Sequence, residues 1–93
     1  KLTPLISGRI IQSVTQHEQT GQVTFRDRSV MTLKLSKPIP ADFNRTTQIK
    51  LVRQEGTQME WEFVDNTSLS IVLANVTANV LLRDAQGHLE YAD

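Results

Sequence analysis

Apolar and polar residues alternate along most of the chain, most clearly in its second half. Met59, Trp61 and Phe63 are separated by acidic residues, and a second alternating run occupies residues 69–73. A period of two places one set of side chains on a buried face and the other toward water. The polar residues 65–67 between the runs favour a tight turn. The pattern predicts a β-hairpin with Trp61 and Phe63 in the core.

The same alternation predicts further strands. They are expected over residues 9–16, 22–26, 30–36, 46–54, 79–83 and 88–91. In 46–54 the period places Ile49 and Leu51 toward the core, and in 88–91 it places Leu89 and Tyr91 on one face. The predicted fold class is all-β: a small single-domain barrel or two-sheet sandwich of about 6–8 antiparallel strands.

Prolines, glycines and polar runs divide the single predicted domain, residues 1–93, into segments. Gly21 is expected to close the turn after the first strand, because glycine tolerates positive φ. Phe43 is expected to anchor a proline-containing loop in the core. The predicted segments are an N-terminal arm (1–8), a first three-stranded unit (9–36), the linker loop (37–45), a second three-stranded unit (46–74) and a C-terminal hairpin (75–93).

A shift of 38 residues superposes the two clearest hairpins and the strands before them. Duplication of a three-stranded unit would produce this match. Two unrelated amphipathic hairpins share much of it as well, because a period of two aligns their apolar positions. The matched pairs are Ile11 with Ile49, Val14 with Val52, Val23 with Trp61, Phe25 with Phe63, Asp27 with Asp65, Ser29 with Thr67, Met31 with Leu69, Leu33 with Ile71, and Leu35 with Leu73.

Composition narrows the function classes. Ten basic and ten acidic residues give zero formal charge, which does not fit a general nucleic-acid coat, whose affinity comes from phosphate neutralisation. The absence of cysteine excludes disulfides, thiolate metal ligands and cysteine catalysis. It also favours a reducing compartment, so we expect a cytoplasmic location. The apolar runs are far shorter than the ~20 residues that span a bilayer.

Candidate chemistry is sparse. His17 and His88 lack the spacing of metal ligands, and the glycines stand singly rather than in a phosphate-binding motif. Glu60 and Glu62 share a strand face, roughly 7 Å apart, a spacing that suits acid–base catalysis. However, nothing in the sequence indicates a cleft around these two acids, and solvated charges at a sheet edge are far more common. We therefore assign no catalytic, cofactor-binding or metal-binding residue and expect no cofactor. A small hydrolase is the third functional hypothesis.

The leading hypothesis is a non-catalytic protein-interaction or assembly module that binds a protein partner, or a second copy, through a sheet edge or loop rim. The expected edges are residues 9–16 and 88–91. The alternative is a nucleic-acid-binding small β-barrel, which would use basic side chains on or beside strands. The candidate contacts for that alternative are Arg9, Arg26, Arg28, Lys34, Arg45, Lys50 and Arg53.

Overall fold

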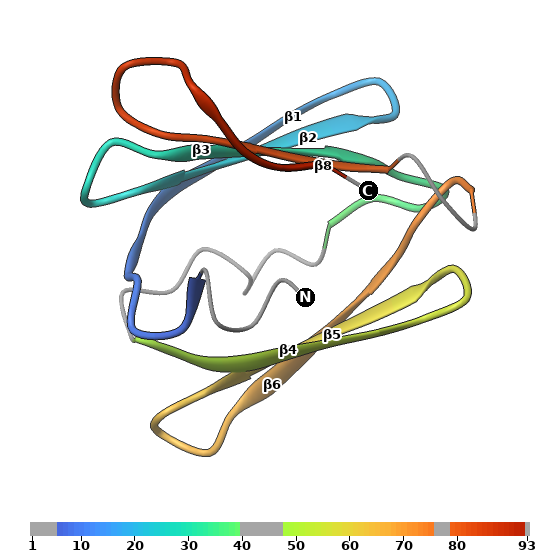
Figure 1. Cartoon of the computed structure of the whole chain (residues 1–93). Helices are drawn as coiled ribbons and strands as arrows, with labels where there is room; N and C mark the ends of the chain where they lie inside the picture. The colour runs from blue at the N-terminus through green and yellow to red at the C-terminus, as the bar shows by residue number, and fades with distance from the viewer. Residues whose placement is uncertain (1–5, 40–47, 76–78, 93) are drawn as a thin grey trace.

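Eight antiparallel strands form two facing sheets in the computed structural model, which describes residues 6–39, 48–75 and 79–92 (Figure 1). The strands are β1 (Ile11–His17), β2 (Thr20–Phe25), β3 (Val30–Lys34), β4 (Ile49–Glu55), β5 (Gln58–Phe63), β6 (Ser68–Val72), β7 (Val80–Arg83) and β8 (Leu89–Ala92). The order is β1-β2-β3-β7-β8 in one sheet and β4-β5-β6 in the other. The all-β prediction is confirmed as a two-sheet sandwich, and the described strands do not close into a barrel.

The two sheets bury their alternating apolar side chains against each other. Trp61 and Phe63 are fully buried, as predicted. The rings of Phe25 and Trp61 stack across the core, with centroids 6.5 Å apart. Ile6 is also fully buried and packs into this core from the segment before β1. The other residues of the predicted arm up to position 5, and the predicted anchor Phe43, lie outside the described residues.

A β-bulge reverses the expected inward and outward positions in β4. Ile49 pairs with Phe63, but Leu51 pairs with Glu62, and the register shifts between the two pairs. Leu51 is therefore only half-buried, and Val52 faces the core instead. The prediction that Leu51 points inward was wrong, because one extra residue breaks the period of two.

A second bulge separates Leu89 from Tyr91 in β8. Tyr91 pairs with Leu82 and packs against the core, whereas Leu89 pairs with Arg83 and is 52% exposed. The prediction that Leu89 and Tyr91 share one face was therefore also wrong.

Gly21 has a different role from the predicted one. It lies inside β2 and is buried, and the turn before it consists of Glu18, which has a φ of 55°, and Gln19. A Cβ atom at Gly21 would lie 2.7 Å from Ile39 Cδ1 and 3.0 Å from Leu35 Cδ1. A larger residue here would have to displace the ends of the Ile39 and Leu35 side chains, so the close packing favours glycine.

The units β1–β3 and β4–β6 correspond residue by residue after a shift of 38. Ile11 pairs with Phe25 in the first unit, as Ile49 pairs with Phe63 in the second, and both units have a bulge directly after these pairs. The turns between the last two strands correspond as well. The equivalent residues Arg28 and Asn66 have φ values of 74° and 68°.

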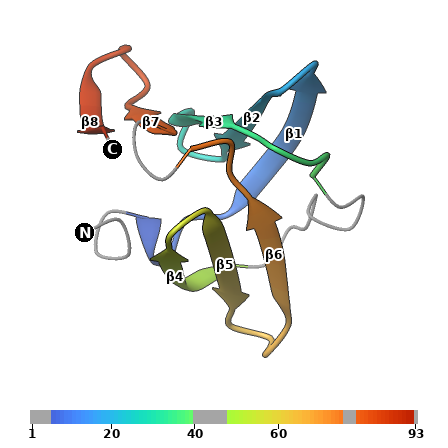
Figure 2. The ribbon, with the colours of Figure 1, turned by 90° about the vertical axis from the view of Figure 1, so that its right-hand side faces the viewer.

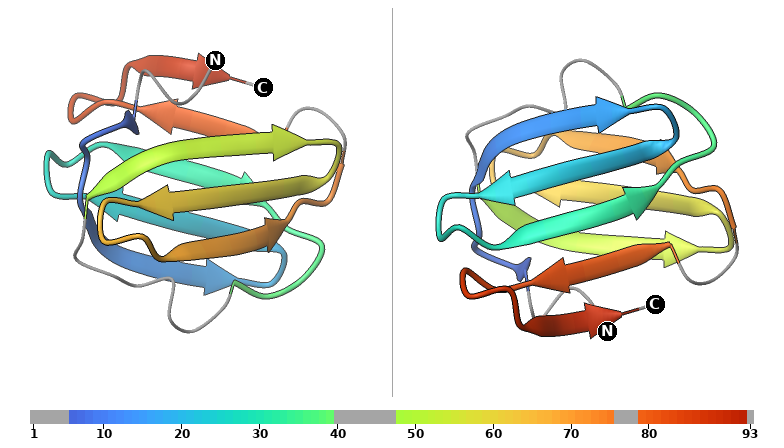
Figure 3. Two further views of the ribbon diagram at one scale, coloured as in Figure 1. Left: turned by 90° about the horizontal axis from the view of Figure 1, so that it is seen from below. Right: turned by 90° about the horizontal axis from the view of Figure 1, so that it is seen from above.

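Two corner bridges join the sheets, at Ile10–Gln48 and at Leu35–Leu73. At the second corner, the Ser36 N–H donates to the Val72 carbonyl over 2.9 Å, and the equivalent Ala74 N–H donates to the Lys34 carbonyl over 3.0 Å. Each bridge joins a residue to its own equivalent. An approximate twofold axis therefore passes through both corners, between the sheets that face each other in Figure 3.

The hairpin β7–β8 departs from this symmetry, because it extends only the five-stranded sheet, beside β3. As a result, β4, β7 and β8 lie on one side of the sandwich, and β1 and β6 lie on the other (Figures 2 and 3).

Asn79, directly before β7, is bonded to Asn75. Its buried amide accepts a hydrogen bond from the Asn75 N–H over 2.9 Å and donates to the Asn75 carbonyl over 2.5 Å. Within the described ranges, no helix is long and apolar enough to cross a membrane.

Candidate functional site: the sheet edges

The β1 strand forms one border of the five-stranded sheet, as the sequence predicted for residues 9–16. His17 and Thr20 flank the two-residue turn into β2. Such a pair exchanges main-chain hydrogen bonds, and bonded pairs then alternate along the strand. The N–H and C=O groups of Val14 and Gln16 therefore point away from β2. No described strand lies on that side.

The β8 strand forms the opposite border, in agreement with the prediction for residues 88–91. This strand is short and bulged, and the Glu90 carboxylate accepts a 3.0 Å hydrogen bond from Arg9. Short length, a bulge and a charged side chain all disfavour pairing with a further strand. Of the two predicted edges, β1 is therefore the more open to a partner.

Arg9 connects three parts of the fold and is only 16% exposed. Its guanidinium lies 3.0 Å from Glu90, donates to the Ser29 hydroxyl over 2.7 Å and lies 3.6 Å from the Asp27 carboxylate. It also lies 5.8 Å from the centroid of the Phe25 ring. Arg9 thus clamps the segment before β1 to the β2–β3 turn and to β8. Sequence reasoning missed this role, because the partners are far apart in the chain.

The Asp27 carboxyl belongs to the same cluster. Partial burial raises its pKa, but hydrogen bonds from the Ser29 hydroxyl and N–H, together with the Arg9 charge, lower it more. The net effect holds the pKa of Asp27 below its ordinary value. The Asp27 carboxyl is therefore ionised at neutral pH, and its negative charge attracts the Arg9 guanidinium.

The basic residues proposed for nucleic-acid binding are distributed over both sheets. Arg26, Arg28 and Lys34 are exposed on the five-stranded sheet or its turns, and Lys50 is exposed on β4. The list also contains Arg9, which is mostly buried in its ion pairs, and Arg53, which pairs with acids. Arg45 lies outside the described residues.

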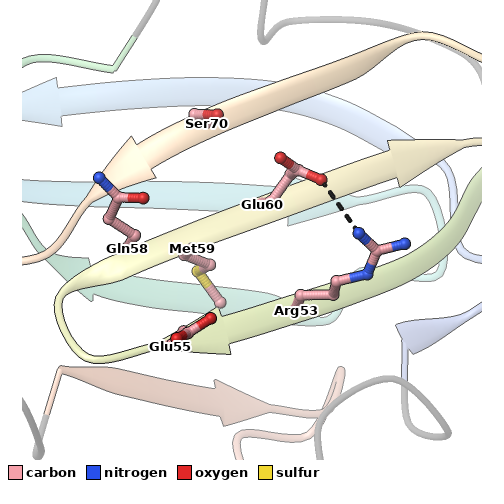
Figure 4. Close-up of a pocket in the computed structure, with 6 residues that line it drawn as sticks. All are labelled: Arg53, Glu55, Gln58, Met59, Glu60 and Ser70. Atoms are coloured by element: carbon pink, nitrogen blue, oxygen red, sulfur yellow. Dashed lines mark ion pairs between the residues drawn. The ribbon is translucent and has the colours of Figure 1, made fainter.

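Glu60, one member of the acidic pair Glu60 and Glu62, lines a shallow depression of about 180 Å³ on the outer face of the three-stranded sheet (Figure 4). Arg53 contacts both carboxylates, at 3.5 Å from Glu60 and 3.3 Å from Glu62. One guanidinium between two acids is typical of a solvated ion-pair network. This arrangement favours a structural role over acid–base catalysis. The depression is lined by Arg53, Glu55, Gln58, Met59, Glu60 and Ser70.

The two histidines lie far apart in the chain, at the end of β1 and before β8. His17 is exposed, and the His88 ring lies 3.5 Å from the Asp84 carboxylate. The pKa of Asp84 is lowered, chiefly by the hydrogen bond that its carboxylate accepts from the main-chain N–H of His88. Among the described residues, no three histidine or acidic side chains cluster as a metal site would require.

Comparison with protein-family models, curated proteins and solved structures finds no match to this chain.

The three-stranded sheet has two further borders, β4 and β6, which sequence reasoning did not name. Alternation predicts strands but does not show that the second unit forms a sheet of its own. The correspondence between the units relates β6 to β3, but the sequence does not show that β7 occupies the outer edge of β3 rather than that of β6.

Proposed function

We propose that this domain is a non-catalytic protein-interaction or assembly module, and that β1 pairs with an extended segment of a protein partner or of a second copy. The proposal rests on the outer edge of β1, beside which no described strand lies. From Ile11 to Gln16 the strand has no charged side chain to repel an incoming strand. Edge pairing then provides main-chain hydrogen bonds, and side chains at alternate positions provide specificity.

The proposed binding edge is shorter than β1 itself, because the bulge after Ile11 interrupts the regular pairing at the start of the strand. Regular pairing begins at Ser13, so the outward groups of Val14 and Gln16 form its centre. The half-buried Val14 packs against the core and offers an apolar contact beside them. An uncharged, extended segment fits this edge best.

The experiment compares Gln16→Pro with Gln16→Ala. Both substitutions remove the Gln16 side-chain oxygen, which accepts a hydrogen bond from the Ile39 N–H over 2.8 Å. Proline in addition removes the outward N–H of residue 16 without breaking the β1–β2 ladder. We expect self-association, measured by sedimentation, or capture of a defined protein from source lysate, to be lost in Gln16→Pro and kept in Gln16→Ala. The proposal fails if the unmodified domain neither self-associates nor retains a protein, or if proline has no effect.

Nuclease treatment of the same capture separates the alternative function. The exposed Arg26, Arg28, Lys34 and Lys50 support nucleic-acid binding as that alternative. Retained material that disappears with nuclease, and an affinity that falls steeply with salt, would favour it. A defined protein that stays bound after nuclease favours the interaction module.

We also infer that the two units arose by duplication. The shared bulge position, the equivalent turns and the two corner bridges support this origin beyond what a period of two explains. A cytoplasmic location remains our proposal as well, supported by the absence of cysteine.

A further inference from the structure

The outer edge of β3 shows how this fold receives an added strand. Thr32 pairs with Leu81 of β7, and the Lys34 N–H donates to the Asn79 carbonyl over 2.9 Å. The approximate twofold axis relates these two positions of β3 to Ser70 and Val72 of β6.

The outer edge of β6 has the same hydrogen-bonding phase. The Phe63 N–H donates to the Thr67 carbonyl, and the Leu73 N–H donates to the Thr57 carbonyl, so the odd-numbered residues of this strand bond to β5. The N–H and C=O groups of Ser68 and Ser70, and the Val72 N–H, therefore point away from β5. In the described part of the chain, no strand occupies that side.

Side chains are more exposed on the side of the sandwich that has no added strand than on the side to which β7 is added. Four residues on the β1 and β6 side of the sandwich are more exposed than their equivalents on the β4 and β7 side. Leu69, for example, is 7% exposed, whereas Met31 is fully buried. The side of the sandwich that carries no added strand is therefore the less completely buried one. The four pairs, with the more exposed member first, are Val14 and Val52, Gln16 and Gln54, Leu69 and Met31, and Ile71 and Leu33.

The sequence of β6 also lacks the features that protect edge strands. Its residues, Ser68–Val72, include no charge and no proline, and its pairing with β5 has no register shift. Natural edge strands commonly carry a charge, a proline or a bulge that prevents further pairing. The outer edge of β6 is therefore chemically open as well as geometrically suited to a strand.

We propose that the outer edge of β6 binds an extended, antiparallel segment of a partner protein that has branched apolar residues at alternate positions. The proposal rests on the proposed function, binding through a sheet edge, and adds a second edge with its own ligand chemistry. β6 and β1 border the same side of the sandwich (Figure 2).

The strand β7 indicates which residues the partner segment needs. Val80 and Leu82 pair with Leu33 and Met31 and are fully buried, whereas Leu81 between them is 40% exposed. At β6, the corresponding inward residues of the partner would lie opposite Ile71 and Leu69. The outward residue between them is unconstrained, so the recognised pattern is apolar, any residue, apolar.

The test uses the full chain, labelled for NMR, and a synthetic peptide with the sequence of residues 79–84. With the peptide at up to about 1 mM, in the range of weak peptide recognition, we expect shifts and slowed hydrogen exchange at the amides of Ser68, Ser70 and Val72. Before the peptide is added, these amides should exchange faster than the equivalent amides of β3, including Thr32 and Lys34.

Matched variants make the test specific. Ser70→Pro removes the central outward N–H and should abolish the peptide effect, whereas Ser70→Ala keeps that N–H and should preserve it. A peptide with serine in place of its two inward residues, equivalent to Val80 and Leu82, should lose at least tenfold in affinity. A peptide with serine in place of the residue equivalent to Leu81 should bind as well as the original.

Three outcomes overturn the proposal. The first is no change at the β6 amides, and the second is an effect that survives Ser70→Pro. The third is protection of Ser70 that grows with protein concentration without peptide, which would make a second copy the occupant. None of these alters the comparison of Gln16→Pro with Gln16→Ala, so failure at β6 is distinguishable from failure of binding at β1.

Discussion

Leu35 and Leu73 form an antiparallel bridge between the ends of β3 and β6, and each is the equivalent of the other in the two units. Both are 1% exposed. The hydrogen bonds of Ser36 and Ala74 flank them symmetrically, so the corner holds the two sheets together at their common axis. Because the positions are equivalent, we expect them to contribute similarly to stability.

This relationship predicts the outcome of a double-mutant cycle. Leu35→Ala and Leu73→Ala should each cost about 2–5 kcal/mol of unfolding free energy, because both remove buried methyl groups. Adjacent residues share a cavity when both are truncated, so the double variant should differ from the sum by about 0.5–3 kcal/mol. Urea unfolding measures all three values. Strict additivity would show that the two side chains do not share an environment.

The aromatic core gives a second prediction. Trp61→Ala or Phe63→Ala should cost about 3–5 kcal/mol, because both side chains are fully buried. Val64→Ala is the control, because Val64 is 53% exposed and its loss should change stability by less than about 0.5 kcal/mol. A cost below about 1 kcal/mol for Trp61→Ala would contradict the assigned register.

A third prediction concerns the close approach at Gly21. In Gly21→Ala the new Cβ would meet the ends of the Ile39 and Leu35 side chains, so we expect a loss of about 1–3 kcal/mol. Ile39→Val shortens the nearer side chain. The double variant should recover part of the loss, as measured by urea unfolding. No recovery would mean that the backbone, rather than Ile39, sets the cost.

Alternation predicted the strands and most of the core, because each unit buries one face of its sheet. It failed at Leu51 and Leu89, where a bulge inserts one residue and reverses the phase. It also predicted the wrong role for Gly21. A glycine that leaves space for the Ile39 side chain cannot be distinguished in the sequence from a glycine in a turn. These local features depend on contacts between distant segments, and sequence alternation carries no information about such contacts.

Only part of the candidate site could be predicted, because the sheet edges also depend on contacts between distant segments. The first and last strands follow from chain order and were placed at edges correctly. The separation of β6 from β3 into different sheets depends on where β7 crosses, and nothing in the local pattern of Val80–Arg83 specifies β3 rather than β6. The clamp of Arg9 on Glu90 likewise appears only in the folded chain.

The Arg9 cluster gives a fourth prediction. Arg9→Met keeps an apolar stem but removes charge-assisted hydrogen bonds to Ser29 and Glu90, so it should cost about 1–3 kcal/mol of unfolding free energy. Arg53→Met is the matched control, because Arg53 is 64% exposed and pairs with acids in solvent. Its loss should cost under about 1 kcal/mol. Equal effects of the two variants would contradict the clamp.

The last prediction concerns the pH dependence of stability at Asp27. Its folded pKa is lowered, so its contribution is fully present above the unfolded pKa, near pH 4. The contribution is lost as pH falls through the folded pKa. Because the side chain is 54% exposed, solvent screening limits the effect to under about 1 kcal/mol. Unfolding free energies below pH 5 should decline less steeply in Asp27→Asn than in the unmodified chain.

Equivalent residues in the two units provide the control for this pH effect. The Ser29 hydroxyl donates to Asp27, and the Thr67 hydroxyl donates to Asp65 over 2.5 Å. Ser29→Ala removes a bond to the ionised carboxylate, so an NMR titration should show a higher pKa for Asp27. Thr67→Ala makes a similar change in the other unit and should leave the pKa of Asp27 unaltered. An Asp27 pKa that is unchanged in Ser29→Ala, or that rises equally in both variants, would show that the Ser29 hydroxyl does not hold this carboxylate in its ionised form.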